Sequence, residues 1–234
     1  MCVRAGTIHR IDASTGDPPR TRRLATCRRQ LDALSPDTGA TFEWAFRWLT
    51  SHEPPPSPPV LIHGDYQLGN LLVDGTDLTG VLDWEWVRIG EANEDLAWFC
   101  LRAWRFGAPA SLGAGGLGSI ESFLAVYREA SGATADAEID LAGFHWWRVM
   151  AALLWGMTVL DQAQQWSSEK AKWSQEKVPS MQLAIMGRQV CEAEWDLLSL
   201  LDGEPISDLG RPPQSPSGAP AGFTSSRAWK DLLG

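Results

Sequence analysis

The sequence is poor in cysteine, and its four cysteines lie far apart. They form no C-x-x-C pair, and no two histidines have the spacing of metal ligands, so neither a disulfide framework nor a zinc site is expected. Apolar runs without charge are also short. The longest apolar stretch, Leu141 to Leu160, contains His145 and Arg148 and favours a core helix over a membrane span. The N-terminus lacks the apolar segment of a secretory signal. We therefore expect a soluble, cytoplasmic protein with no membrane partner.

Basic residues are scarce relative to acidic ones. The chain has 20 Lys and Arg against 29 Asp and Glu, a formal net charge of −9. A surface for nucleic-acid phosphates needs a basic face, so a nucleic-acid partner is not expected. The one basic cluster comprises Arg20, Arg22, Arg23, Arg28 and Arg29. We interpret it as a solvated face or a packing surface for acidic neighbours, with an anion contact as the alternative.

Hydrophobic periodicity predicts two helices, over residues 20–35 and 40–51, which end at the proline-rich segment 54–59. Three short β-type runs follow, at residues 60–63, 70–73 and 80–83. Four further helices are predicted over residues 94–106, 119–131, 138–166 and 168–200, with Ser119 as an N-cap. The Pro-, Gly- and Ser-rich tail, 203–234, is predicted to be disordered. These patterns predict an α+β, predominantly helical fold with a small β-hairpin region.

The second and third β-type runs predict a hairpin around Asp74-Gly75. If Val73 pairs with Gly80, Asn70 lies opposite Asp83, with the two Cβ atoms about 4.5–5.5 Å apart. A tight two-residue turn at Asp74-Gly75 is the alternative, and it would separate Asn70 from Asp83. We prefer the wider loop because it keeps the apolar residues of the two strands opposite each other.

An amide oxygen from Asn70 and a carboxylate from Asp83 could hold one hard cation. Mg²⁺ accepts such ligands and usually keeps waters and substrate phosphates in its shell. Asp65, on the loop before Asn70, is placed to accept a proton from an attacking hydroxyl or to orient it. The set predicts phosphoryl transfer to an alcohol. The alternative is that these residues only shape turns and helix caps.

Two motifs carry a resemblance to a known family. His63-Gly-Asp-Tyr-Gln-Leu-Gly-Asn70 fits H-G-D-x-x-x-x-N, and Asp83-Trp-Glu85 fits D-x-[DE]. With the following Glu94-Asp-Leu-Ala-Trp98, they resemble the aminoglycoside phosphotransferase family of kinase-like enzymes, most closely the kinase-like domains fused to acyl-CoA dehydrogenases. The resemblance implies a protein-kinase-like C-terminal lobe over residues 1–202, with the site in residues 60–85 and a helical part in residues 94–202.

The resemblance also implies roles for the motif residues. Asp65 would be the catalytic base, Asn70 and Asp83 the Mg²⁺ ligands, and ATP the phosphoryl donor. The acceptor would be a hydroxyl of a small molecule, which the sequence does not name.

Three further residues have implied supporting roles. His63 would hold the catalytic loop through backbone hydrogen bonds, and Asp95 would organise the site from the following helix. Glu85 would be a second metal ligand or a phosphate-side residue, or else an exposed charge. Two departures from the family pattern are Leu68, in place of a proline, and Gly90-Glu-Ala92, in place of Gly-Asp-Pro.

The sequence before His63 shows no pattern that corresponds to the nucleotide-binding small lobe of kinase-like enzymes. That lobe supplies a lysine from a strand, whereas the residues before His63 predict helices and the first lysine is Lys170. We therefore expect a phosphotransferase that needs an upstream segment or a partner to supply the small lobe. The second hypothesis is a catalytically silent C-terminal lobe that serves as a binding or interaction module.

Overall fold

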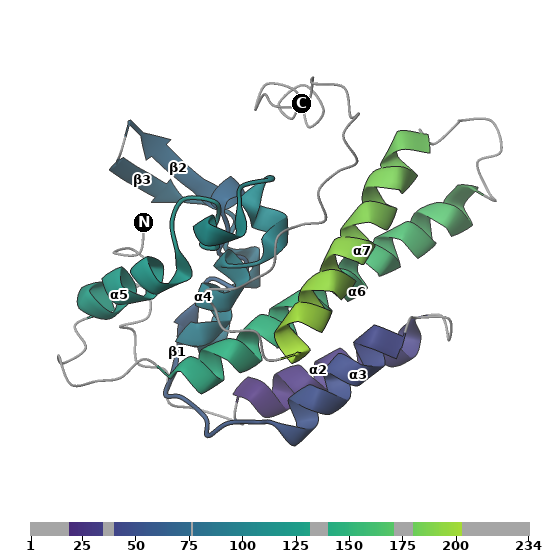
Figure 1. The fold of residues 1–234 in the computed structure, drawn as a ribbon, viewed down its shortest axis with the longest axis horizontal. Coiled ribbons are helices and arrows are strands. Elements are labelled where there is room, and N and C mark those ends of the chain that lie inside the picture. The colour runs from purple at the N-terminus through teal and green to yellow at the C-terminus, as the bar shows by residue number, and fades with distance from the viewer. Residues whose placement is uncertain (1–18, 35–39, 76, 132–139, 171–179, 203–234) are drawn as a thin grey trace.

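The structure, a computed structural model, describes residues 19–34, 40–75, 77–131, 140–170 and 180–202. These ranges hold mostly α-helices and two small antiparallel sheets (Figure 1). In Figure 1, α6 and α7 run side by side, α2 and α3 lie below them, and the β2–β3 hairpin projects at the opposite side. The predicted α+β, predominantly helical fold is confirmed. The predicted disordered tail, 203–234, lies outside the described residues.

The two N-terminal helices form where the periodicity predicts them. α2 covers Pro19–Ala33 and α3 covers Ala40–Ser51. In α3, Phe42, Ala45 and Leu49 are spaced at helical intervals and are all buried, so the helix turns one apolar face inward. That face packs against α6 (Leu141–Lys170) and α7 (Ser180–Leu201).

α6 is the central element of the core. Its first half buries residues on several sides because α3, α4 (Ala92–Phe99) and α7 all pack against it. Trp146, Trp147, Met150 and Leu153 are among its fully buried side chains. A helix that is apolar all round is expected in a core, so the interpretation of this stretch as a core helix is confirmed. Among the described residues, no helix combines the length and apolarity needed to span a bilayer.

The segment predicted as one helix over residues 94–106 is divided. α4 ends at Phe99, and a separate 3₁₀ turn covers Arg102–Arg105. Between them, Leu101 is extended, with ψ of 142°, and its side chain belongs to the core. Farther along, α5 covers Ile120–Ser131. The Ser119 hydroxyl accepts the Ser122 N–H at 3.1 Å, which confirms the predicted N-cap.

The first sheet contains a strand that the sequence did not predict. β1 (Pro59–Ile62) pairs antiparallel with β4 (Arg88–Glu91), with Ile62 opposite Arg88. β4 carries a charge at each end and no apolar run, which is why the pattern missed it. Gly90 permits the pairing, because a Cβ there would lie 2.4 Å from Cδ1 of Ile62. β4 leads directly into α4 and so fixes where that helix begins.

The second sheet, the hairpin of β2 (Leu71–Asp74) and β3 (Asp77–Val81), corrects the predicted register. Gly80 pairs with Leu72 and not with Val73, so the pairing of Asn70 with Asp83 is wrong. The tight turn at Asp74-Gly75 is also wrong, because Asp74 pairs with Asp77 across Gly75 and residue 76.

A β-bulge accounts for the difference. Leu72 pairs with Gly80 and Val73 with Leu78, which leaves Thr79 as an extra residue on β3. The Thr79 hydroxyl donates to the carbonyl of Leu72 at 3.2 Å. The bulge lets a tight turn coexist with the apolar pairing of Leu71 with Val81.

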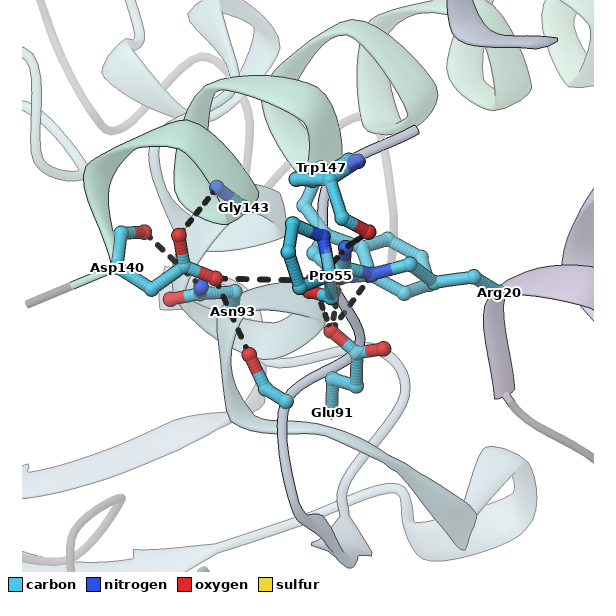
Figure 2. A network of polar contacts seen from close by, with 9 residues as sticks. Arg20, Pro55, Glu91, Asn93, Asp140, Gly143 and Trp147 are labelled. Atoms are coloured by element: carbon cyan, nitrogen blue, oxygen red, sulfur yellow. Dashed lines mark hydrogen bonds and ion pairs between the residues drawn. The ribbon is translucent and has the colours of Figure 1, made fainter. Parts of the chain in front are cut away.

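A buried ion pair joins the N-terminal helix to the sheet and the core (Figure 2). Arg20 and Glu91 both have fully buried side chains, and Arg20 donates from Nε at 2.8 Å and from Nη2 at 2.5 Å to Oε2 of Glu91. Trp147 Nε1 donates to the same oxygen at 3.1 Å. Arg20 Nη1 donates to the carbonyls of Pro54 and Pro55. At Arg20, the basic cluster is therefore a packing surface for an acidic neighbour.

Replacing Arg20 tests how much this network contributes. In Arg20→Met, the buried Glu91 carboxyl group loses its cationic partner and the hydrogen bonds that Arg20 donates, so we expect a loss of about 3–5 kcal/mol in the free energy of unfolding. The matched control is Arg22→Met, an exposed position on the same helix, for which we expect a change within about 0.5 kcal/mol. Urea unfolding followed by circular dichroism measures both. Equal stability of the two variants would contradict the assigned role.

Candidate active site

The site is built on the loop that follows β1, and one carboxylate anchors that loop. Asp95, buried in the first turn of α4, accepts the N–H of His63 on Oδ2 and the N–H of Gly64 on Oδ1, each at 2.8 Å. Gly64 has φ of +86°, and a Cβ there would lie 2.4 Å from the carbonyl oxygen of Trp86. The loop can therefore approach the following turn this closely only with glycine.

The side chain of His63 connects the loop to the end of the hairpin. The Asp65 N–H donates to Nδ1 at 3.2 Å, which makes Nδ1 an acceptor. Nε2 must then carry the proton, and it donates to the carbonyl of Leu82 at 2.8 Å. The fully buried ring also packs against Trp84, with centroids 4.6 Å apart. His63 thus bridges the residue chosen as the base and the residue that precedes Asp83.

Asp65, the predicted base, is held from two sides. Asn70 Nδ2 donates to Oδ2 at 2.8 Å, and Trp98 Nε1 donates to Oδ1 at 2.7 Å. Asn70 Nδ2 also donates to the Asp65 backbone carbonyl at 2.9 Å. The half-buried carboxylate therefore has a set orientation, and each oxygen retains a lone pair for a further donor.

Trp98 was not predicted as a site residue. The sequence motif Glu94–Trp98 contains it without assigning it a role, and its ring packs near Trp104 and Trp155. The signal that could have found it is its spacing from Asp95. Residues three apart on a helix share a face, so both side chains of α4 can reach the same loop.

Asn70 and Asp83, the predicted metal ligands, lie near each other but not in direct register. The Leu82 N–H donates to the Asn70 carbonyl at 2.8 Å, so Asp83 lies one residue beyond the bridging position. Asp83 is exposed, in a left-handed conformation with φ of 62°, and its side chain does not cap the 3₁₀ turn Trp84–Trp86 that follows. Asn70 uses Nδ2 for its bonds to Asp65, so Oδ1 is the atom that it could offer to an ion.

The chemistry of these two oxygens suits a Mg²⁺ ion. Within the described ranges, no group of three or more His, Cys, Asp or Glu side chains is arranged to hold a metal. The protein's contribution would then be one amide oxygen and one carboxylate, a set that suits an ion which keeps waters and substrate phosphates. Glu85 lies exposed in the 3₁₀ turn, outside the hydrogen bonds that surround Asp65. The roles of Asn70, Asp83 and Glu85 stay predictions.

Charged neighbours support the turn between the hairpin and β4. Arg88 donates from Nη1 to the carbonyl of Trp86 at 2.8 Å and pairs through Nη2 with Glu94. Arg23, from the basic cluster, also pairs with Glu94 at 3.1 Å.

Tyr127, on α5, is a further ionisable neighbour of Asp95. Burial, and then the negative charge of Asp95, raise the pKa of its phenol, so this hydroxyl stays protonated.

Apolar side chains are exposed next to the site. They lie on the hairpin and in the turn that follows it, and we call them the hairpin apolar residues: Leu72, Val73, Leu82, Trp84, Trp86 and Val87. Trp86 is 59% exposed and Val73 63%. A group of large apolar side chains of this kind often marks a surface that another polypeptide covers.

Known proteins are similar to this chain in sequence. Residues 5–133 match the model of the phosphotransferase enzyme family. Acyl-CoA dehydrogenase family member 10 of Mus musculus is 32% identical over 82 residues, which are 34% of this chain and 8% of the relative. Acyl-CoA dehydrogenase family member 11 of Gallus gallus is 36% identical over 107 residues, which are 44% of this chain and 13% of the relative. The chain thus spans only a small part of these relatives.

Solved structures share the fold. A presumed aminoglycoside phosphotransferase from Ralstonia eutropha aligns with a TM-score of 0.64 and 16% identity, over 87% of this chain and 64% of its own. Macrolide 2'-phosphotransferase type I aligns with a TM-score of 0.51 and 15% identity, over 81% of this chain and 56% of its own. The family model covers more than half of the chain, and the relatives are those that the motifs indicated. The chain therefore belongs to the phosphotransferase enzyme family.

Proposed function

We propose that this chain is the large lobe of a kinase-like phosphotransferase that moves the γ-phosphoryl group of ATP to a hydroxyl of a small molecule. The observation that carries the proposal is the arrangement of Asp65, whose carboxylate is oriented by Asn70 and Trp98 on a loop that Asp95 anchors. Catalysis of phosphoryl transfer depends mainly on positioning and on charge stabilisation. A carboxylate held in this way is suited to such positioning.

Asp65 would act as the proton acceptor. The acceptor hydroxyl would donate to a free lone pair of the Asp65 carboxylate, and this would orient its oxygen toward the γ-phosphorus. As the new oxygen–phosphorus bond forms and the bond to ADP breaks, the hydroxyl proton would pass to Asp65. His63 and Asp95 would not touch the substrate and would act by holding the loop.

Asn70 and Asp83 would hold the metal. Asn70 would serve two purposes, since Nδ2 orients Asp65 while Oδ1 is left for the ion. Asp83 would supply an exposed carboxylate from the end of the hairpin. Mg²⁺, when bound, would neutralise charge on the donor phosphates. Glu85 would be a further contact on the phosphate side.

The exposed hairpin apolar residues support a role for a second lobe. We propose that a nucleotide-binding lobe packs on them, supplied by another part of a longer chain or by a partner. The same exposure also favours the second candidate function, in which these residues dock a protein partner and no phosphoryl group is transferred. Measurements of nucleotide binding and of phosphoryl transfer distinguish the two candidate functions.

Removing Asp83 tests the metal site. We expect Asp83→Ala to abolish Mg²⁺-dependent binding of ATP in calorimetric titration, because the ion loses its charged ligand. The matched control is Asp77→Ala, an exposed aspartate of the same hairpin that lies beyond the bulge, which should bind as the unaltered chain does. If both variants bound Mg-ATP equally, the assignment of Asp83 would be wrong. If the unaltered chain bound none even with a small lobe supplied, the docking function would be favoured.

Replacing Asp65 separates binding from chemistry. Asp65→Asn keeps the shape of the side chain and the Mg²⁺ ligands but cannot accept the proton. We expect Mg-ATP binding to be unchanged and the transfer rate to fall by about 10²–10⁴-fold. The measurement is release of ADP with a panel of hydroxyl acceptors. Full transfer by this variant would contradict the role of Asp65 as base.

Trp98→Phe tests the orientation of that base. The variant retains an aromatic ring on α4 but loses the N–H that donates to Asp65. We expect kcat to fall about tenfold or more with KM little changed, since a hydrogen bond to a charged group contributes about 1.5–3 kcal/mol. Trp155→Phe is the matched control, a ring in the same cluster whose substitution should leave kcat unchanged. Equal kinetics in the two variants would contradict the role of Trp98 in orienting Asp65.

A further inference from the structure

One arginine contacts three segments of the candidate active site. Arg88, on β4, donates from Nη1 to the carbonyl of Trp86 at 2.8 Å and pairs through Nη2 with Glu94 of α4. Its Nη1 also lies against Gly64, because a Cβ added to that residue would collide with it. Arg88 thus contacts the loop after β1, the 3₁₀ turn Trp84–Trp86 and α4.

Asp83, the predicted metal ligand, adopts a backbone conformation that needs support. Its φ of 62° is left-handed, which is uncommon for a residue other than glycine. Its side chain makes no hydrogen bond that caps the turn after it. A conformation of this kind persists only where the surrounding structure holds it in place. The contacts on either side of Asp83 therefore determine where its carboxylate points.

The chain before Asp83 is held through the backbone of Leu82. The Leu82 N–H donates to the carbonyl of Asn70 at 2.8 Å. The Leu82 carbonyl accepts the hydrogen bond from Nε2 of His63, also at 2.8 Å. Both partners belong to the segment between β1 and β2, so this segment fixes the point from which Asp83 starts.

The chain after Asp83 is held at both ends of one 3₁₀ turn. Trp84 begins the turn, and its ring packs against the loop after β1. Trp86 ends the turn, is exposed, and has its carbonyl fixed by the hydrogen bond from Arg88. A charged donor makes this a strong type of hydrogen bond. The turn is short, so loss of this bond would also free the backbone of Asp83.

Glu94 sets the direction of the Arg88 guanidinium group. The Glu94 side chain is 9% exposed and lies in the first turn of α4, next to Asp95. Its Oε1 also pairs with Nε of Arg23, from α2, at 3.1 Å. Both arginines therefore compensate the charge of Glu94, but the bond to the Trp86 carbonyl comes from Arg88. This difference makes Arg23 a matched control for Arg88.

We propose that Arg88 is a positioning residue for the metal side of the active site. By fixing the carbonyl of Trp86 against α4, it holds Asp83 in the conformation in which the carboxylate can bind Mg²⁺ together with Asn70. The inference rests on the proposed function, which assigns the ion to Asp83. Arg88 acts through the turn and not on the ion. A lysine cannot replace it, because one ammonium group lacks the rigid fork that donates in two directions.

The Mg²⁺ dependence of ATP binding tests this role in Arg88→Lys, with Arg23→Lys as the control. Both variants keep a positive charge beside Glu94, and urea unfolding should show similar stability for the two. In calorimetric titration, we expect the Mg²⁺ concentration that gives half-maximal ATP binding to rise about 10–100-fold in Arg88→Lys. Arg23→Lys should match the unaltered chain. An equal Mg²⁺ requirement in the two variants would overturn the inference.

Amide hydrogen exchange, followed by NMR without nucleotide, tests the same role independently of ATP. The Val87 N–H closes the turn by donating to the Trp84 carbonyl, whereas the Leu82 N–H lies before Asp83. In Arg88→Lys we expect exchange at Val87 to become about tenfold faster or more, with Leu82 unchanged. Unchanged exchange at Val87 would overturn the inference. If Arg88→Lys fails to fold, Arg88→Met, which also leaves Arg23 on Glu94, has the same expected result.

The two measurements separate this inference from the proposed function. If the unaltered chain shows no Mg²⁺-dependent binding of ATP even with a small lobe supplied, the proposed function fails, and exchange at Val87 still decides whether Arg88 holds the turn. If the unaltered chain binds Mg-ATP and both lysine variants bind it equally well, the proposed function stands and the role of Arg88 is wrong.

Discussion

The geometry of the candidate site depends on one buried carboxylate. Asp95 accepts two consecutive backbone N–H groups, those of His63 and Gly64, and so fixes the loop at the point where β1 ends. Two backbone donors that point at one carboxylate define both the position and the direction of the chain that follows. Asp65 comes directly after this fixed point, so its side chain starts from a backbone with little freedom.

The helix that carries Asp95, α4, also contributes Trp98 to the site, and the sheet of β1 and β4 sets the position of this helix. α4 carries both Asp95 and Trp98, and β4 runs into it without an intervening loop. The pairing of β4 with β1 and the ion pair of Glu91 with Arg20 therefore determine where α4 begins. A site made of short segments thus gains its rigidity from the buried contacts behind it, as phosphoryl transfer by positioning requires.

The sequence predicted the elements better than it predicted the contacts between them. The helices were found because their apolar residues recur over many turns, and Asp65 and Asn70 were grouped because a local motif contains both. The hairpin register was missed because a bulge at Thr79 leaves no trace in the alternation of apolar residues. The contact of Trp98 with Asp65 spans 33 positions and depends on how α4 is docked, which periodicity does not specify.

The bulge has a consequence for how the hairpin can vary. It lies between the tip, Asp74 to Asp77, and the bridge of Leu82 with Asn70. Changes in pairing at the tip can be absorbed at Thr79, where one unpaired residue already breaks the ladder. Such changes at the tip therefore need not reach the end of the hairpin that lies next to Asn70 and Asp83. The tip is the natural place to insert a label or a short tag while leaving the candidate site in its geometry.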